Sequence, residues 1–152
     1  MISIQPAQLG QSAVCQMILA DLPLWFGRPE ANRHYLAFVE NHPTFVAYDA
    51  AKPIGFLTLK QHFPEAAEIY VMGVLADYHR QGVGRKLVNA AESYLHDNGT
   101  RFLQVKLGAA HPDGGYRRTR LFYLGVGFIP LEEFDDLWGA NNPALLLVKY
   151  LR

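Results

Sequence analysis

The stretch VLADYHRQGVGRKL, residues 74–87, holds the clearest structural signal in the sequence. An apolar run over residues 68–75 is typical of a strand, whereas from Val83 onward the apolar residues recur at helical spacing. Gly82 and Gly84 therefore lie where a strand passes into a helix. Because the first N–H groups of a helix have no intrahelical partner, such a junction is suited to binding a phosphate.

The junction does not match two common nucleotide-binding motifs. A dinucleotide-binding turn needs a third glycine after Gly84, where Leu87 stands, and an acidic residue at the end of the next strand, which is not found. A P-loop needs Gly-Lys-Ser/Thr, and this sequence is also absent. The residues alone thus leave two interpretations open, a phosphate cradle and a tight turn without a ligand.

The segments on either side of the junction predict a mixed α/β domain. The order of strand, helix and strand over residues 68–107 favours a parallel pair, and the polar connection 49–53 indicates an antiparallel hairpin before it. Gly73, inside a strand pattern, indicates a bulge or a close approach of another backbone. Strands are expected at residues 2–4, 44–48, 54–59, 68–75, 103–107 and 144–150, with a further apolar segment at 128–131, and helices at 14–22, 35–39, 83–95 and 119–124.

Composition narrows the class of protein. The 152 residues fit one domain, and 14 basic against 14 acidic side chains give no net charge, which argues against a nucleic-acid partner. Cys15 is the only cysteine, so we expect no internal disulfide and a cytoplasmic protein. No apolar run is long enough for a membrane span, the first ten residues do not resemble a signal peptide, and the six histidines have no metal-ligand spacing. We therefore expect neither a membrane partner nor a metal.

Two motifs resemble the GNAT superfamily of N-acyltransferases. Residues 74–87 are similar to its coenzyme A signature, Gln/Arg-x-x-Gly-x-Gly/Ala, and residues 122–128, FYLGVGF, are similar to its Tyr-x-x-x-Gly-Phe motif. The resemblance covers nearly the whole chain and implies one GNAT domain over residues 1–152, with antiparallel N-terminal strands, a splayed parallel pair and flanking helices. His79 departs from the pattern, since it stands where the family has Gln or Arg.

The resemblance implies the donor and the way it binds. Backbone amides of the glycine-rich turn would bind the pyrophosphate of acetyl-CoA, and the pantetheine arm would lie along the strand that ends near Val74. A bulge near Gly73 would separate the parallel strands to admit that arm. Three basic side chains of the turn are suited to the nucleotide phosphates, although a solvated basic helix face explains them equally well. The predicted donor contacts are Val74, Arg80, Gln81, Gly82, Val83, Gly84, Arg85 and Lys86.

Two side chains are candidates for proton transfer. Tyr123, in the second motif, is the predicted general acid, because a phenol at the sulfur can protonate or hydrogen-bond the departing thiolate. A core aromatic residue is the alternative interpretation of Tyr123. Glu68, at the start of its strand, is the predicted base toward the attacking ammonium, with Glu65 and Tyr70 as alternatives.

The acceptor side is less well defined. Trp25 and Phe26 lie in a proline-bounded segment where periodicity is lost, and we predict that they line the amine pocket, with a place in the core as the alternative. The expected reaction is acetyl transfer to a primary amine of a small molecule or peptide, by direct attack in a ternary complex. A non-catalytic acyl-CoA sensor, a different acyl-CoA and an O-acceptor remain open, as does a homodimer.

Overall fold

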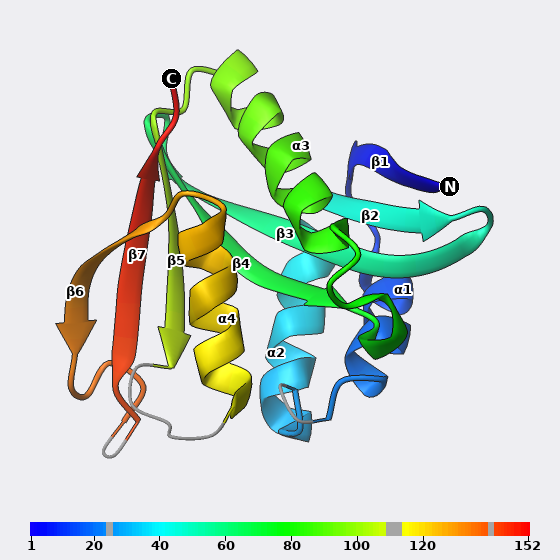
Figure 1. Ribbon diagram of the computed structural model, residues 1–152, viewed down its shortest axis with the longest axis horizontal. Helices are drawn as coiled ribbons and strands as arrows, with labels where there is room; N and C mark the ends of the chain where they lie inside the picture. The colour runs from blue at the N-terminus through cyan, green and yellow to red at the C-terminus, as the bar shows by residue number, and fades with distance from the viewer. Residues whose placement is uncertain (24–25, 109–113, 140–141) are drawn as a thin grey trace.

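The computed structural model describes residues 1–23, 26–108, 114–139 and 142–152. Within these ranges one seven-stranded sheet has the order β1-β2-β3-β4-β5-β7-β6, and only the β4–β5 pair is parallel (Figure 1). This sheet confirms the predicted mixed α/β fold. The strands are β1 (Ile2–Gln8), β2 (Thr44–Asp49), β3 (Lys52–Phe63), β4 (Ala66–Val74), β5 (Phe102–Gly108), β6 (Ile129–Phe134) and β7 (Ala144–Tyr150).

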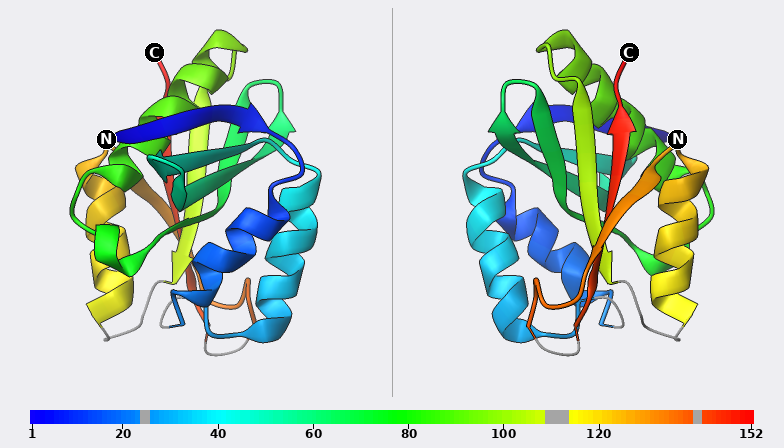
Figure 2. Two further views of the ribbon diagram at one scale, coloured as in Figure 1. Left: turned by 90° about the vertical axis from the view of Figure 1, so that its right-hand side faces the viewer. Right: turned by 90° about the vertical axis from the view of Figure 1, so that its left-hand side faces the viewer.

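Helices cover the sheet on both faces, as Figure 2 shows. Helices α1 (Ser12–Ala20) and α2 (Pro29–Glu40) lie on one face, while α3 (Val83–Asp97) and α4 (Gly114–Gly125) lie on the other. A short 3-10 helix, η1 (Ala76–Tyr78), links β4 to the turn before α3. None of the described helices is long and apolar enough to cross a membrane.

Each helix layer encloses its own apolar cluster. Helix α3 buries one stripe of side chains against the sheet and ends at Asp97, followed by the capping residue Asn98 and by Gly99 with φ of +84°. Cys15 and Ile18 of α1 pack on the opposite face against Phe56. The α3 stripe is Val83, Leu87, Val88, Ala91 and Leu95.

The parallel pairing of β4 with β5 is short, and the place where it ends determines where the candidate site lies. Strands β4 and β5 pair over only three positions, which end at Glu68 opposite Gln104. Both strands then continue, β4 to Val74 and β5 to Gly108, and they separate as they do so (Figure 1). The predicted splay is therefore present, and Glu68 and Gln104 mark its apex.

The bulge in β4 is not at Gly73, where we expected it. Val71 pairs with Thr58 and Ile69 with Leu59, so Tyr70 is the extra residue of the bulge. Gly73 pairs regularly with Phe56. A Cβ at Gly73 would meet side chains and not another backbone, since it would lie 3.2 Å from Leu22 Cδ1 and 3.3 Å from the Phe56 ring.

Several segments differ in extent from the prediction. The connection expected over residues 49–53 is only the turn at residues 50–51, because β2 continues through Asp49 and β3 begins at Lys52. Ala50 has a φ of +53° there. Strand β1 and helix α4 are longer than expected, since β1 extends to Gln8 and α4 begins at Gly114.

Candidate active site

The turn before α3 is shaped to bind an anion. Gly82, the residue preceding the helix, has a φ of +81°, and Arg80 has a φ of +63°. A right-handed residue followed by a left-handed one, as in Gln81 and Gly82, turns neighbouring N–H groups toward one concave surface. The first intrahelical bond runs from Lys86 N–H to the Gly82 carbonyl, so the amides of residues 83–85 have no acceptor within α3. The geometry fits the predicted phosphate cradle.

Gly84 contributes to helix packing as well as to the turn. A Cβ on Gly84 would lie 2.9 Å from Cε1 and Cζ of Phe122, so the absence of a side chain lets α4 approach α3. Nη2 of Arg85 donates a hydrogen bond of 3.3 Å to the Gly125 carbonyl and joins the same two helices. These contacts place Phe122, and with it Tyr123, next to the start of α3.

His79 holds the turn against the strand. Its Nε2 lies 2.7 Å from the carbonyl oxygen of Val74, the last residue of β4. The imidazole therefore spans η1 and ties the end of β4 to the start of the glycine-rich turn. This contact gives the unusual residue at the first motif position a structural role.

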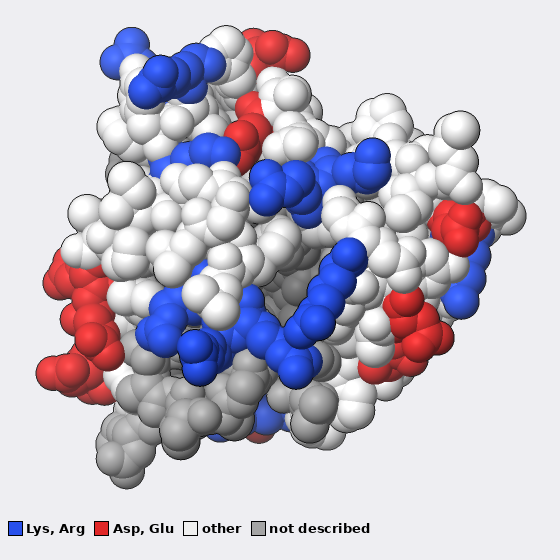
Figure 3. Space-filling model, viewed as in Figure 1, with Lys and Arg blue, Asp and Glu red and all other residues white. Residues whose placement is uncertain are grey.

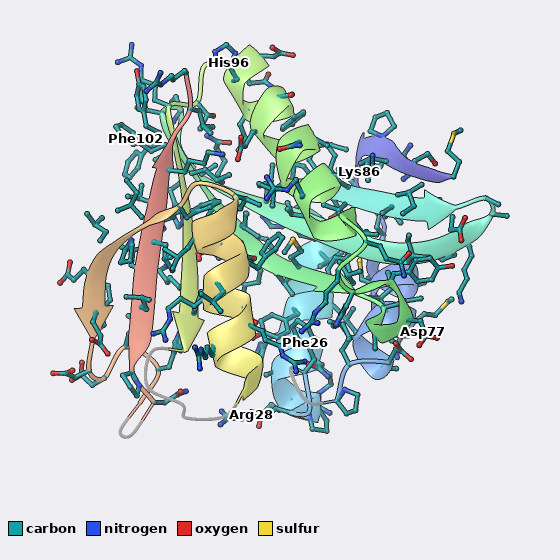
Figure 4. All side chains as sticks on the ribbon, viewed as in Figure 1. Phe26, Arg28, Asp77, Lys86, His96 and Phe102 are labelled. Carbon is teal, nitrogen blue, oxygen red and sulfur yellow. The ribbon has the colours of Figure 1, made fainter. Side chains whose placement is uncertain are left out.

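A basic surface surrounds this turn. Figure 3 shows Lys and Arg side chains gathered around a hollow on the face that carries α3 and α4. Arg80, Arg85 and Lys86 are exposed, and Figure 4 shows Lys86 on α3. A surface of this charge attracts a polyanion even though the whole chain has no net charge.

Tyr123 lies in the core between α4 and the sheet. The residue is 4% exposed, and its ring packs edge-on against Phe122 and Phe128, with centroids 5.0 and 5.4 Å apart. Burial raises the pKa of Tyr123 above its usual range, which keeps the phenol protonated at neutral pH. The side chain is thus both a core aromatic residue and a group equipped to donate a hydrogen bond.

Glu68 forms a polar cluster at the apex of the splay. Its side chain is 8% exposed, and its Oε1 lies 2.7 Å from Nε2 of His62. Lys106 Nζ and Gln104 Nε2 each donate a hydrogen bond of 3.3 Å to the same oxygen. Strands β3, β4 and β5 thus each contribute to one buried carboxylate.

The sequence predicted Glu68 as a candidate base, but it did not predict that His62, Gln104 and Lys106 contact this residue. In the sequence, Gln104 and Lys106 are the polar residues of an alternating strand. Leu103 and Val105, the apolar residues of that strand, are buried on the other face of the sheet. His62 lies at the end of β3, beyond the predicted strand. The alternation was a usable signal, because residues two apart share one face of a strand.

The two alternative bases have different surroundings. Glu65 is exposed in the β3–β4 turn, where its carbonyl accepts hydrogen bonds from the amides of Arg101 and Phe102. The Tyr70 ring stacks on Phe38 at 3.9 Å, and burial, followed by the charge of Glu68, raises the pKa of Tyr70. Glu68 is thus the buried carboxylate of the three candidates.

An aromatic row extends from the bulge toward the connection between α1 and α2. Tyr70 contacts Tyr35 edge-on at 6.1 Å, and Tyr35 contacts Phe26 edge-on at 6.0 Å. Phe26 is half-buried, and its carbonyl accepts a 2.6 Å hydrogen bond from Nδ2 of Asn32. Trp25, the other residue predicted to line the acceptor pocket, lies outside the described residues.

Comparison with known proteins adds to this geometry. Over 73 residues the chain is 33% identical to a mycothiol acetyltransferase from Corynebacterium glutamicum, a match that covers 47% of this chain and 25% of that protein. The fold is similar to that of a protein assigned to the GNAT family from Desulfovibrio desulfuricans, with a TM-score of 0.86, 14% identity and full coverage of both chains.

A GNAT family acetyltransferase from Elizabethkingia anophelis, solved with acetyl-CoA bound, has a TM-score of 0.76 at 18% identity, with 99% of this chain and 98% of that one covered. The model of the acetyltransferase (GNAT) family matches residues 12–124, which is most of the chain and includes the first motif and the start of the second. With the splayed parallel pair and the glycine-rich turn in place, these matches show that the chain belongs to the acetyltransferase (GNAT) family.

Proposed function

We propose that this protein transfers the acetyl group of acetyl-CoA to a primary amine by direct attack in a ternary complex. The observation that carries the proposal is the apex of the splay. There a buried carboxylate, Glu68, lies on one face of the sheet, while the glycine-rich turn and Tyr123 lie with α3 and α4 on the other. A donor and an acceptor that approach from opposite faces can meet between the two strands.

The donor side would be built mainly from the backbone. The amides of Val83, Gly84 and Arg85 are suited to the pyrophosphate, and the field of the α3 N-terminus favours the same anion. Exposed Arg80 and Lys86 would add charge-assisted contacts. Acetyl-CoA supplies an activated thioester, and the mycothiol acetyltransferase relative and the acetyl-CoA-bound neighbour support this choice of donor.

The proton transfers are assigned to Glu68 and Tyr123. An aliphatic ammonium must lose a proton before its nitrogen has a lone pair for attack, and Glu68 would accept that proton directly or through a water molecule. Tyr123 would donate a hydrogen bond to the sulfur as the carbon–sulfur bond breaks. Because the pKa of Tyr123 is raised, hydrogen-bond donation suits this phenol better than complete proton transfer.

The test is an acceptor screen with acetyl-CoA in which the released thiol is measured. The panel contains small amines, amino acids, aminoglycosides, peptides with free N-termini and a lysine peptide, with alcohols as O-acceptors. Acetyl-CoA binding is measured separately by calorimetry. Turnover with an amine supports the proposal. Tight binding without turnover would favour a sensor, and turnover only with alcohols would favour an O-transferase.

A further inference from the structure

The contact between His62 and Glu68 is shorter than the other polar contacts at the apex. Nε2 of His62 lies 2.7 Å from Oε1 of Glu68, whereas Lys106 Nζ is 3.3 Å from the same oxygen. The Glu68 side chain is 8% exposed and the His62 side chain is 28% exposed. The imidazole therefore connects a buried carboxylate with solvent, as does Lys106, whose side chain is equally exposed.

The need to balance the charge of Glu68 does not explain why His62 contacts this carboxylate. One carboxylate needs one cation, and Lys106 supplies it at 3.3 Å. Gln104 Nε2 also donates to Oε1, so the oxygen already has two donors without the imidazole. What His62 adds is an imidazole, which can accept a proton at one ring nitrogen and donate a proton from the other.

We infer that His62 is a positioning residue that turns Glu68 into the first member of a two-residue proton outlet. This inference rests on the proposed function, since it assigns Glu68 as the base. Glu68 accepts a proton from the acceptor ammonium, and His62 takes it from Glu68 and releases it to solvent. Lys106 holds the carboxylate in place and takes no proton.

The protons balance in three steps. An N–H bond of the acceptor ammonium breaks, and an O–H bond forms on Glu68. In the neutral tautomer with its hydrogen on Nδ1, Nε2 of His62 then takes the proton, which leaves a carboxylate and an imidazolium that donates from Nε2 to Oε1. Nδ1 gives a proton to water, which leaves the neutral tautomer with its hydrogen on Nε2. Nδ1 then takes a proton from water and Nε2 releases its proton to water, which restores the starting tautomer with one proton passed to solvent. Glu68 is then ready for the next acceptor.

Groups from three strands would influence this transfer. Tyr70 faces the pair of His62 and Glu68 from β4, and Gln104 and Lys106 face it from β5. On β3 itself, Lys60 pairs in register with Glu68, and its Nζ lies 5.8 Å from the centre of the Tyr70 ring. A pH profile therefore has to be read as a difference between variants.

His62→Gln is the decisive variant, because glutamine can still donate to Glu68 but cannot carry a proton. The acceptor is the amine with the highest turnover in the screen. We expect kcat/KM at pH 8 to fall about 10- to 100-fold, with acetyl-CoA affinity and melting temperature unchanged. The wild-type rate should fall as pH decreases through the histidine range. That inflection should be absent from His62→Gln.

His96→Gln is the matched control. His96 also neighbours a carboxylate, with Nδ1 3.9 Å from Oδ1 of Asp97, but both side chains are exposed, and Figure 4 shows His96 at the end of α3 far from Phe26. This variant should keep the wild-type pH profile. A His62→Ala variant should regain activity with added imidazole, since the His62 position is open to solvent.

Each other outcome overturns the inference in a recognisable way. If Glu68→Gln abolishes turnover while His62→Gln keeps the wild-type rate and pH profile, the outlet is wrong and the proposed function stands. If both variants are as active as wild type, Glu68 is not the base. If wild type turns over no amine although it binds acetyl-CoA, the proposed function fails and the outlet fails with it.

Discussion

The two faces of the sheet at the β4–β5 junction are built in different ways. On the α3 face, the candidate donor site is a backbone turn of consecutive residues, with Gly82 and Arg80 at positive φ. On the opposite face, the apex cluster consists of side chains from three strands around Glu68. Substitutions in the backbone turn should therefore change coenzyme affinity, whereas substitutions in the apex cluster should change the rate of chemistry.

The largest expected effect is that of Glu68→Gln. This variant removes a proton acceptor and keeps the shape of the side chain, so kcat should fall about 10²- to 10⁴-fold, or roughly 3 to 5 kcal/mol of barrier. Acetyl-CoA affinity by calorimetry should stay within about twofold, since Glu68 faces away from α3. A large loss of coenzyme affinity in Glu68→Gln would contradict the prediction that the apex cluster affects only the rate of chemistry.

Tyr123→Phe tests a residue of the donor face that acts on the chemical step. Loss of one preorganised hydrogen-bond donor should lower kcat by about 10²- to 10³-fold, or roughly 3 to 4 kcal/mol. The ring contacts with Phe122 and Phe128 remain, so thermal unfolding should change little. A wild-type single-turnover rate would show that Tyr123 is a core residue only.

Gly84→Val probes the cradle itself. The new side chain must displace the Phe122 ring, which lies 2.9 Å from the Cβ position, and so separates α3 from α4. Acetyl-CoA affinity should fall about tenfold, equivalent to about 1.4 kcal/mol. Gly82→Ala is the comparison, because its Cβ meets no atom within 4 Å and only the φ of +81° opposes it. Unchanged affinity of Gly84→Val would remove the turn from the donor site.

The buried Cys15 thiol of α1 should make the stability of the fold depend on pH. Burial raises the pKa of the Cys15 thiol to about 12. The unfolded thiol ionises first, so folding stability should decrease as pH rises above 9, by up to about 1.4 kcal/mol per pH unit. Urea unfolding of wild type and Cys15→Ala between pH 8 and 11 isolates this slope. Parallel curves for the two proteins would contradict the predicted burial effect.

The smallest expected effect is on the backbone of the turn. Arg80 has a φ of +63°, which costs a non-glycine residue about 1 to 2 kcal/mol. Arg80→Gly should raise the free energy of unfolding by about 0.5 to 1 kcal/mol, after the entropy cost of glycine is subtracted. Acetyl-CoA affinity should fall about two- to tenfold with the lost guanidinium. Arg80→Lys keeps both the charge and the positive φ, so its stability should match wild type.

The sequence predicted the donor side more fully than the acceptor side. Gly82, Gly84 and the helical face from Val83 are neighbours in the chain, so local rules of turn and helix formation identify them. The bulge was expected at Gly73 and lies at Tyr70, because a bulge depends on how β4 pairs with β3. A close approach of another backbone was the alternative at Gly73, and tertiary packing instead places the side chains of Ile18, Leu22 and Phe56 there.

By itself, the sequence determined the mixed α/β class, the glycine-rich turn before α3 and the candidate residues Glu68 and Tyr123. Local periodicity and residue type carry the fold class and the turn, since they act over a few neighbouring residues, whereas the resemblance to a family motif made Tyr123 a candidate. Only the tertiary structure brought His62 and Lys106 to one oxygen of Glu68, from positions 6 and 38 residues away in the chain. The reason is strand register, which depends on the whole sheet and cannot be read from the residues of a single strand.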